Sequence, residues 1–276
     1  MSDTPFTVTR PDTVLHGEVA GEGPVILLLH GLSATRRYVV HGSRALQRAG
    51  YRVVTYDARG HGDSPPAADP GAYDYPTLAA DALAVLDAVG ADRAVLVGQS
   101  MGSATAVAVT LAHPERVDAL VVVTPAHRGE PTDQGDRWDA LADGFQHGGT
   151  EGFVAAYGPP PVPERQLEAI RTVMRQRMDR HRHPQGVAAA LRATPRSAAF
   201  PGLDALRGIR VPTLIVGSRD ELDAEHPISV AHEYAARIPG ATLITEDPGE
   251  SPLAWRGGSL SQAILRWLAT TPAGSR

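Results

Sequence analysis

The sequence predicts an α/β protein with a doubly wound, mostly parallel sheet and a helical cap insertion. Short, unbroken apolar runs recur along the chain, and such runs are typical of strands that are buried on both faces. Helical patterns separate most of these runs, and alternation of strand and helix favours right-handed crossovers between parallel strands. One long stretch interrupts this alternation with helical patterns alone, which predicts the insertion.

The expected elements follow from these patterns in chain order. The first twenty residues alternate apolar and polar side chains, which predicts an antiparallel hairpin at one edge of the sheet. The apolar runs that predict buried strands are 25–29, 52–57, 94–98, 119–123, 213–217 and 241–245. Helical spacing of apolar side chains predicts helices at about 75–89, 101–112, 226–237 and 260–268.

The interruption predicts a separate helical unit. Residues 158–163 read Gly-Pro-Pro-Pro-Val-Pro, which cannot join a helix or a strand ladder. Helical patterns surround this segment at 137–145, 150–157 and 164–181, and the last carries an inward-facing stripe of Leu167, Ile170, Met174 and Met178. We therefore predict a core made of 1–124 and 207–276, and a helical cap made of 125–206.

Composition excludes several classes of protein. The chain has 276 residues, 42% of them hydrophobic, and this is enough for a large core. Its net charge of −5 argues against a nucleic-acid partner. It has no cysteine, so disulfides, thiolate metal sites and a cysteine nucleophile are excluded. Without a run of about 18 apolar residues or a signal-peptide pattern, we expect no membrane partner and a cytoplasmic protein.

The segment Gly98-Gln99-Ser100-Met101-Gly102 carries the first chemical signal. It follows a buried strand and opens a helix, which is the geometry of a nucleophile elbow that lifts a serine hydroxyl above the sheet edge. Glycine is needed beside such a tight turn because a Cβ atom would clash. The pattern predicts Ser100 as a nucleophile, and the alternative is a passive serine in a glycine-rich turn.

A second signal is His30-Gly31-Leu32, which closes the first parallel strand. A backbone N–H at this turn would face the serine, so the Leu32 and Met101 N–H groups are expected to form an oxyanion hole. We expect the His30 imidazole to pack the turn rather than to react.

Together these motifs resemble the α/β-hydrolase superfamily. The segments 56–64 (Tyr-Asp-Ala-Arg-Gly-His-Gly-Asp-Ser) and 214–220 (Leu-Ile-Val-Gly-Ser-Arg-Asp) also match the superfamily, in its order, over nearly the whole chain outside the cap. The resemblance implies that Asp220 is the catalytic acid, with Asp223 as a nearby rival. It implies scaffold roles for Asp57, Arg59 and His61. The fold hosts many chemistries, so the resemblance does not define a substrate.

The general base departs from the superfamily pattern. The histidine expected after the last strand is replaced by Glu250, and no histidine follows His232. Glutamate, with an ordinary pKa of about 4.3, is a weak base for a serine hydroxyl. Glu250 could act if burial and Asp220 raised its pKa. Alternatively, His226 or, second, His127 supplies the base, or no acyl-enzyme chemistry occurs.

The sequence thus predicts hydrolysis of a small carboxylic ester, thioester or related acyl substrate by a small-molecule enzyme with no cofactor. Ser100 would attack the carbonyl, and Asp220 with Glu250 or His226 would handle protons. The alternative is a non-hydrolytic protein of the same fold, either a cofactor-independent lyase or cyclase, or a ligand-binding or regulatory module.

Three further residues are candidates for substrate contact. Arg36 and Arg37 follow the His30-Gly31 turn closely, and His127 follows the fourth apolar run. Arginine suits recognition of a carboxylate or phosphate group. We found no cluster of metal-ligating residues and no glycine-rich phosphate loop in the sequence.

Overall fold

The computed structural model describes residues 3–132, 134–159, 164–219, 225–247, 255 and 257–271. It contains one eight-stranded sheet in the order β1-β2-β4-β3-β5-β6-β7-β8. The strands are β1 (Thr4–Thr9), β2 (Val14–Ala20), β3 (Val25–Leu29), β4 (Arg52–Tyr56), β5 (Ala94–Gln99), β6 (Val117–Val123), β7 (Thr213–Val216) and β8 (Thr242–Ile244). Strands β1 and β2 pair antiparallel, β2 pairs antiparallel with β4, and the remaining pairs are parallel.

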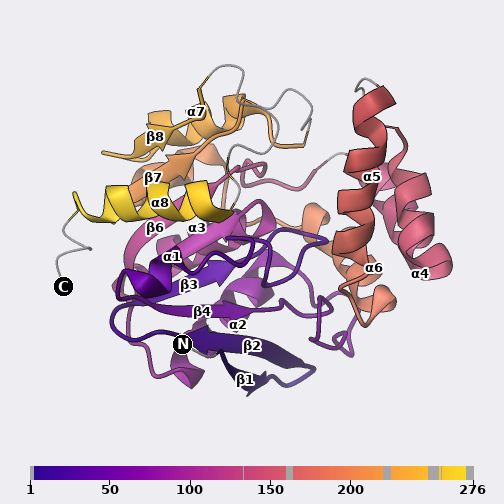
Figure 1. Ribbon diagram of the computed structural model, residues 1–276, viewed down its shortest axis with the longest axis horizontal. Helices are drawn as coiled ribbons and strands as arrows, with labels where there is room; N and C mark the ends of the chain where they lie inside the picture. The colour runs from indigo at the N-terminus through magenta and orange to yellow at the C-terminus, as the bar shows by residue number, and fades with distance from the viewer. Residues whose placement is uncertain are drawn as a thin grey trace.

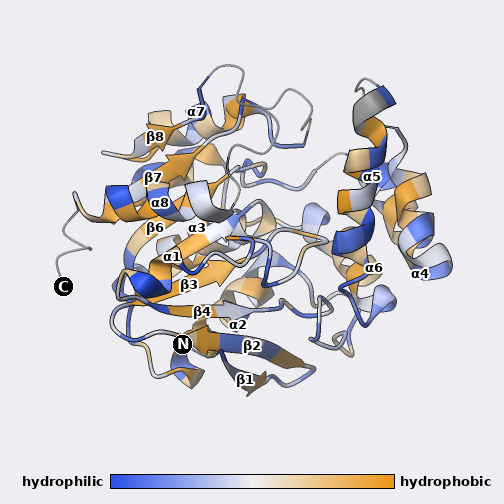
Figure 2. Ribbon diagram, viewed as in Figure 1, coloured by the Kyte–Doolittle hydropathy of each residue, from blue (hydrophilic) through white to orange (hydrophobic). Residues whose placement is uncertain are grey.

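This sheet confirms the predicted fold class. All six apolar runs form parallel strands, and the first twenty residues form the edge hairpin. Along β3, Leu27 and Leu29 face one apolar cluster, whereas Ile26 and Leu28 face another. A strand that is apolar on both faces needs cover on both sides, and helices supply it. The central strands are accordingly coloured as hydrophobic in Figure 2.

Helices lie on both faces of the sheet (Figure 1). One face packs against α2 (Tyr75–Ala88), α3 (Met101–Ala112) and α7 (Ile228–Arg237), and the other against α1 (Ala45–Arg48) and α8 (Gly257–Leu268). The N-cap residue of α2 is Asp74, whose carboxylate accepts a hydrogen bond from the Thr77 N–H at 2.9 Å. The core of the molecule therefore consists of two apolar layers with the sheet between them.

The insertion between β6 and β7 is helical, as predicted. It contains α4 (Gly135–Tyr157), α5 (Glu164–Met178), α6 (Pro184–Ala193) and the short 3₁₀ helices η2 (Thr194–Arg196) and η3 (Leu203–Gly208). No strand occurs in the described residues between 125 and 206. Figure 1 shows α4, α5 and α6 together at one side of the sheet. They share an apolar cluster made of Leu141, Ala142, Phe145, Phe153, Met178, Val187, Ala188 and Leu191.

The predicted stripe on α5 is only partly buried. Met174 and Met178 are buried, whereas Leu167 and Ile170 are half-buried.

Helix α4 spans both helices that were expected there, with non-helical backbone at Gly149 (φ 57°, ψ −147°). Glycine adopts this region without steric cost, so the break separates two helical halves.

One helix boundary differs from the expectation and matters for function. Helix α7 begins at Ile228 rather than at His226, because Pro227 occupies the N-cap position with extended backbone (φ −62°, ψ 135°). A residue that precedes proline is disfavoured in helical conformation. His226 therefore lies in the loop, where its side chain is not committed to a helix face.

Candidate active site

Ser100 lies at a strained turn between β5 and α3, as predicted. Its backbone has φ 52° and ψ −114°, a region that side-chain-bearing residues rarely occupy. A Cβ atom on Gly98 would lie 2.1 Å from the Gly102 carbonyl oxygen, and one on Gly102 would lie 2.1 Å from the Leu29 oxygen. Only glycine fits at both positions, so the spacing seen in the sequence has a direct steric cause.

His226 reaches this serine from the loop before α7. Its Nε2 atom lies 2.8 Å from the Ser100 Oγ atom. A neutral imidazole with its proton on Nδ1 accepts a hydrogen bond from the hydroxyl through Nε2, and this is the geometry of a nucleophile and its base. Among the alternatives that the sequence left open, the contact favours His226.

The loop that carries His226 is joined to the cap. Glu225 accepts a hydrogen bond from the Arg137 Nη2 atom at 2.5 Å. The Arg137 guanidinium also lies 5.5 Å from the centre of the Tyr157 ring, which is within the range of a cation–π contact. Both residues belong to α4, so this helix contacts the residue next to the candidate base.

The turn after β3 passes directly beside the serine. A Cβ atom on Gly31 would lie 3.3 Å from the Ser100 Cβ atom and 3.9 Å from its Oγ atom. Within the described chain, neither the Leu32 N–H nor the Met101 N–H donates a hydrogen bond to another residue. Met101 is the first residue of α3, where the helix dipole favours negative charge. The expectation that these two donors form an oxyanion hole stays a prediction.

His30 packs this turn, as expected. The Ala58 N–H donates to its Nε2 atom at 2.9 Å, and its Nδ1 atom donates to the Gly31 oxygen at 2.8 Å. Burial lowers the pKa of His30 to about 4, so the ring is neutral near pH 7. Both ring nitrogens form hydrogen bonds with backbone atoms, and these bonds fix the path of the turn.

Asp57 and Arg36 also support the turn. The fully buried Asp57 accepts hydrogen bonds from the Arg36 N–H at 2.7 Å and the Asp63 N–H at 3.0 Å, and it pairs with the Arg36 guanidinium. The other arm of Arg36 contacts Glu18 and Asp63, each at 2.9 Å. Arg36 is therefore occupied by three carboxylates, and the prediction that it contacts substrate gains no support.

The neighbouring Arg37 remains more open. Its side chain is 64% exposed, and it lies 3.8 Å from Glu18. An ion pair this exposed holds an arginine weakly. The proposed role of Arg37 in substrate contact stays a prediction.

Arg59 and His61 have the scaffold roles that the resemblance implies. Arg59 is buried and binds Asp81 through two nitrogens, at 2.7 and 2.9 Å, and Asp12 at 2.9 Å. The His61 Nδ1 atom donates to the Arg59 carbonyl oxygen at 2.9 Å. These contacts join the loop after β4 to the turn between β1 and β2 and to α2, rather than to the serine.

His127 does not have the environment expected of a base or a ligand contact. Its Nδ1 atom accepts from the Gly129 N–H at 2.8 Å, and its Nε2 atom donates to the Ser197 oxygen at 3.2 Å. The ring packs against Tyr75 and Phe200, and burial lowers its pKa. Both ring nitrogens form hydrogen bonds with backbone atoms, so the geometry favours a structural role for His127.

The three acidic candidates Asp220, Asp223 and Glu250 lie outside the described residues, and their roles stay predictions. A described carboxylate that the sequence patterns did not reveal lies nearby in the chain. Glu246, just after β8, is buried, and its Oε1 atom accepts hydrogen bonds from the Ser218 hydroxyl at 2.8 Å and the Arg219 N–H at 2.5 Å. Its position joins the loops after β7 and β8.

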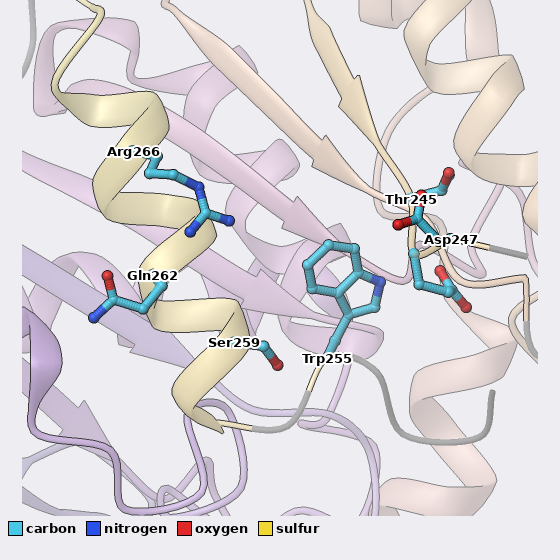
Figure 3. Close-up of a pocket in the computed structure, with 7 residues that line it drawn as sticks. Thr245, Asp247, Trp255, Ser259, Gln262 and Arg266 are labelled. Atoms are coloured by element: carbon cyan, nitrogen blue, oxygen red, sulfur yellow. The ribbon is translucent and has the colours of Figure 1, made fainter. Parts of the chain in front are cut away.

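A cavity of about 420 Å³ lies between the end of β8 and α8 (Figure 3). The Trp255 indole stands between the helix and the strand end, and its Nε1 atom donates to the Gly217 oxygen at 2.9 Å. The lining residues are Thr245, Glu246, Asp247, Trp255, Ser259, Gln262 and Arg266. Ser100 and His226 are not among them.

Within the described ranges, no three His, Asp or Glu side chains are grouped so that they could hold a metal ion. None of the helices that the structure describes combines the length and the apolar character needed to cross a membrane.

Fold and site together define a hydrolase-type scaffold, with a serine at an elbow and a histidine in contact with it. Residues 24–256 match the model of the alpha/beta hydrolase fold family. The chain belongs to the α/β-hydrolase family.

Similar proteins are named as hydrolases of several kinds. The chain is 29% identical, over 88% of its length and 87% of the relative's, to a protein of Caulobacter segnis whose name is that of a carbamate hydrolase (RutD). It is 26% identical to a thermophilic esterase from Thermogutta terrifontis, with a TM-score of 0.78 and 98% of each chain covered. An enol-lactonase from Burkholderia xenovorans is 25% identical, with a TM-score of 0.75 over 93% of this chain and 97% of that one.

Proposed function

We propose that this protein is a serine hydrolase that cleaves a small carboxylic ester or a related acyl substrate. The observation that carries the proposal is the 2.8 Å contact between the Ser100 Oγ and His226 Nε2 atoms. A serine hydroxyl needs a base within hydrogen-bonding reach to become a nucleophile at neutral pH. The esterase and lactonase names of the similar structures point to the same chemistry.

The proposed reaction uses these groups in sequence. Ser100 attacks the substrate carbonyl carbon while His226 accepts the hydroxyl proton. The Leu32 and Met101 N–H groups stabilise the negative charge that develops on the carbonyl oxygen. As the tetrahedral intermediate collapses, His226 returns the proton to the leaving group. Water then attacks the acyl-enzyme with His226 again acting as the base, and this releases the acid and restores Ser100.

The acid that orients His226 is proposed from the resemblance. In the sequence, Asp220 comes four residues after the last residue of β7 and six residues before His226. Because His226 supplies the base in this mechanism, Glu250 is not required to take the serine proton. Its proposed role is that of a second carboxylate that influences proton transfer.

The surroundings of Leu32 support a small substrate with an apolar part. Leu32 packs both against the cap cluster, together with Trp138 and Tyr157, and against the cluster that contains Met101. The same residue therefore offers an oxyanion donor and an apolar surface. Ester, lactone and carbamate substrates all present a carbonyl group to such a site, and the carbamate-hydrolase name of a relative adds the last of these.

Steady-state hydrolysis of nitrophenyl esters, a lactone and a nitrophenyl carbamate tests this proposal. We expect turnover of at least one class, with a loss of about 10³-fold or more in Ser100→Ala and His226→Ala. The exposed cap residue His147 provides a matched control, and His147→Ala should keep full activity. Equal turnover in the wild type and Ser100→Ala would overturn the proposal and favour the non-hydrolytic alternative.

A further inference from the structure

A histidine of the cap makes hydrogen bonds to two loops of the core. His181 follows α5 and is buried. Its Nδ1 atom lies 2.9 Å from the Gly62 nitrogen, and its Nε2 atom lies 3.1 Å from the Ser33 oxygen. A backbone N–H only donates and a carbonyl oxygen only accepts, so the two partners fix the tautomer with the proton on Nε2. His181 thus connects the loop after β3 with the loop after β4.

The Ser33 contact is next to the oxyanion donor. The Ala34 N–H donates to the Gly31 oxygen at 3.0 Å, so Gly31, Leu32, Ser33 and Ala34 form a β-turn. Ser33 is the third residue of this turn and has φ 60°. That position favours glycine, and another residue there costs about 1–2 kcal/mol. The turn therefore needs external contacts to hold its shape.

His181 is well suited to hold the turn because it is itself firmly placed. The next residue, Arg182, donates its N–H to the Gly62 oxygen at 3.0 Å and pairs with Asp63 at 2.7 Å. A Cβ atom on Gly186 would lie 2.6 Å from the Gly60 Cα atom, so the two backbones are in direct contact. The segment 181–186 of the cap is thus docked on the loop after β4.

The charge state of His181 suits the same role. Burial and, to a smaller extent, the neighbouring His61 ring lower its pKa to about 3. The imidazole stays neutral near pH 7, which keeps Nδ1 available as an acceptor for Gly62. A charged ring would lose that bond, because both of its nitrogens would then be donors.

We propose that His181 is a positioning residue for the oxyanion hole. Through its hydrogen bond to the Ser33 carbonyl it sets the orientation of the Leu32 N–H group, so the hole is complete only when the cap is docked. The inference rests on the proposed serine-hydrolase function and extends it, since it makes a cap residue responsible for transition-state stabilisation at a site in the core.

Two substitutions of His181 test this role. His181→Leu removes both hydrogen bonds, whereas His181→Gln keeps one donor and one acceptor on its amide. We expect kcat to fall about 10–100-fold in His181→Leu with little change in KM. A misplaced Leu32 N–H group would stabilise the transition state less and would hardly affect binding of the substrate. His181→Gln should recover at least part of kcat. The exposed His147→Leu should match the wild type.

A tetrahedral inhibitor separates positioning from loss of fold. Phenylboronic acid adds to Ser100 and places an oxygen in the oxyanion hole, so its inhibition constant should rise with the loss of kcat/KM across the variants. Adding Ser33→Gly to His181→Leu removes the backbone strain at Ser33, and we expect several-fold recovery of kcat. Unchanged kcat and boronate inhibition in folded His181→Leu would overturn the inference.

The two proposals fail in different ways. If the wild type neither hydrolyses any acyl substrate nor binds the boronate, the serine-hydrolase function itself is wrong. If the wild type does both and the His181 variants lose only thermal stability, with kcat and the inhibition constant unchanged, then His181 has a structural role alone. In case His181→Leu does not fold, a His181→Gln variant with a raised kcat/KM or a lowered inhibition constant would contradict the positioning role.

Discussion

Arg137 of the cap helix α4 binds Glu225, the residue beside His226 in sequence, with 2.5 Å between the Nη2 and Oε1 atoms. The two side chains are 40% and 25% exposed, and ion pairs this exposed contribute about 1 kcal/mol or less to stability. The contact matters because of its position. Glu225 is next to His226 in sequence, so an ion pair to the cap restrains the segment from which His226 reaches Ser100. In the proposed mechanism His226 is the base, so this restraint should affect the rate more than the stability.

We therefore predict that Arg137→Gln lowers kcat/KM by about 3–10-fold and leaves the melting temperature within about 2 °C of the wild type. High salt should reduce the wild-type activity toward that of the variant, because salt screens exposed ion pairs. Arg175→Gln is the matched control, since Arg175 pairs with Glu151 and Glu168 on the cap surface. Equal loss in both variants would show that the effect is not specific to the His226 loop.

The elbow glycines give a stability prediction. Gly102→Ala should destabilise the fold by about 3 kcal/mol or more and abolish activity, because its Cβ atom would meet the Leu29 backbone oxygen at 2.1 Å. Gly148→Ala in α4 should be neutral or slightly stabilising, since a Cβ atom there meets no atom of the described chain within 4 Å. Urea unfolding measures both variants. Similar midpoints for the two would contradict the steric explanation of the motif.

Three buried histidines predict acid sensitivity. Burial lowers the pKa of His30 to about 4 and those of His61 and His181 to about 3. Below the ordinary histidine pKa of about 6.5 the unfolded chain binds protons that the folded chain does not, so stability falls as the pH drops toward the folded pKa values. Each of these histidines then lowers the free energy of unfolding by up to about 1.4 kcal/mol for each pH unit.

Urea unfolding between pH 7 and pH 5 measures this loss. His61 is the best residue to remove, because its Nε2 atom is buried and has no hydrogen-bond partner among the described residues. His61→Leu should flatten the pH dependence relative to the wild type, whereas replacement of the exposed His147 should not. A wild-type stability that stays constant over this range would show that these rings are not buried in neutral form.

The fold was predictable because its signals are local. A strand covered on both faces must be apolar throughout, so Ile26 and Leu28 were recognisable although they pack against a different layer from Leu27. The short helix α1 and the cap helix α6 were not predicted, because their stability comes from packing rather than from a strong periodic pattern. Helix α7 begins two residues later than predicted, because Pro227 disfavours helical backbone at His226.

The site was predictable only in part. The Ser100 turn follows from glycine spacing, which is a local steric requirement. His226 was one candidate among several. It contacts a serine 126 residues earlier in the chain, and that contact depends on the arrangement of the strands in the folded sheet. The roles first expected for Arg36 and His127 depended on surroundings that the sequence does not display. Glu18 lies 18 residues from Arg36, and Ser197 lies 70 residues from His127.

The acidic members of the site give a further prediction. If Asp220 orients His226, Asp220→Asn should lower kcat by about 10³–10⁴-fold, while KM changes little. Glu250→Gln should have a smaller effect, because His226 takes the serine proton in the proposed mechanism. Stopped-flow and steady-state hydrolysis of a nitrophenyl ester measure both variants. A loss in Glu250→Gln as large as that in Asp220→Asn would make Glu250 part of the catalytic machinery.

The central claim is that His226 activates Ser100, and the rate of covalent labelling by a fluorophosphonate measures this most directly. Peptide mapping should place the label of the wild type on Ser100. We predict that labelling is absent in Ser100→Ala and slower by at least about 10²-fold in His226→Gln, with a near-normal rate in Glu250→Gln. Labelling that proceeds at the wild-type rate in His226→Gln but is lost in Glu250→Gln would contradict it.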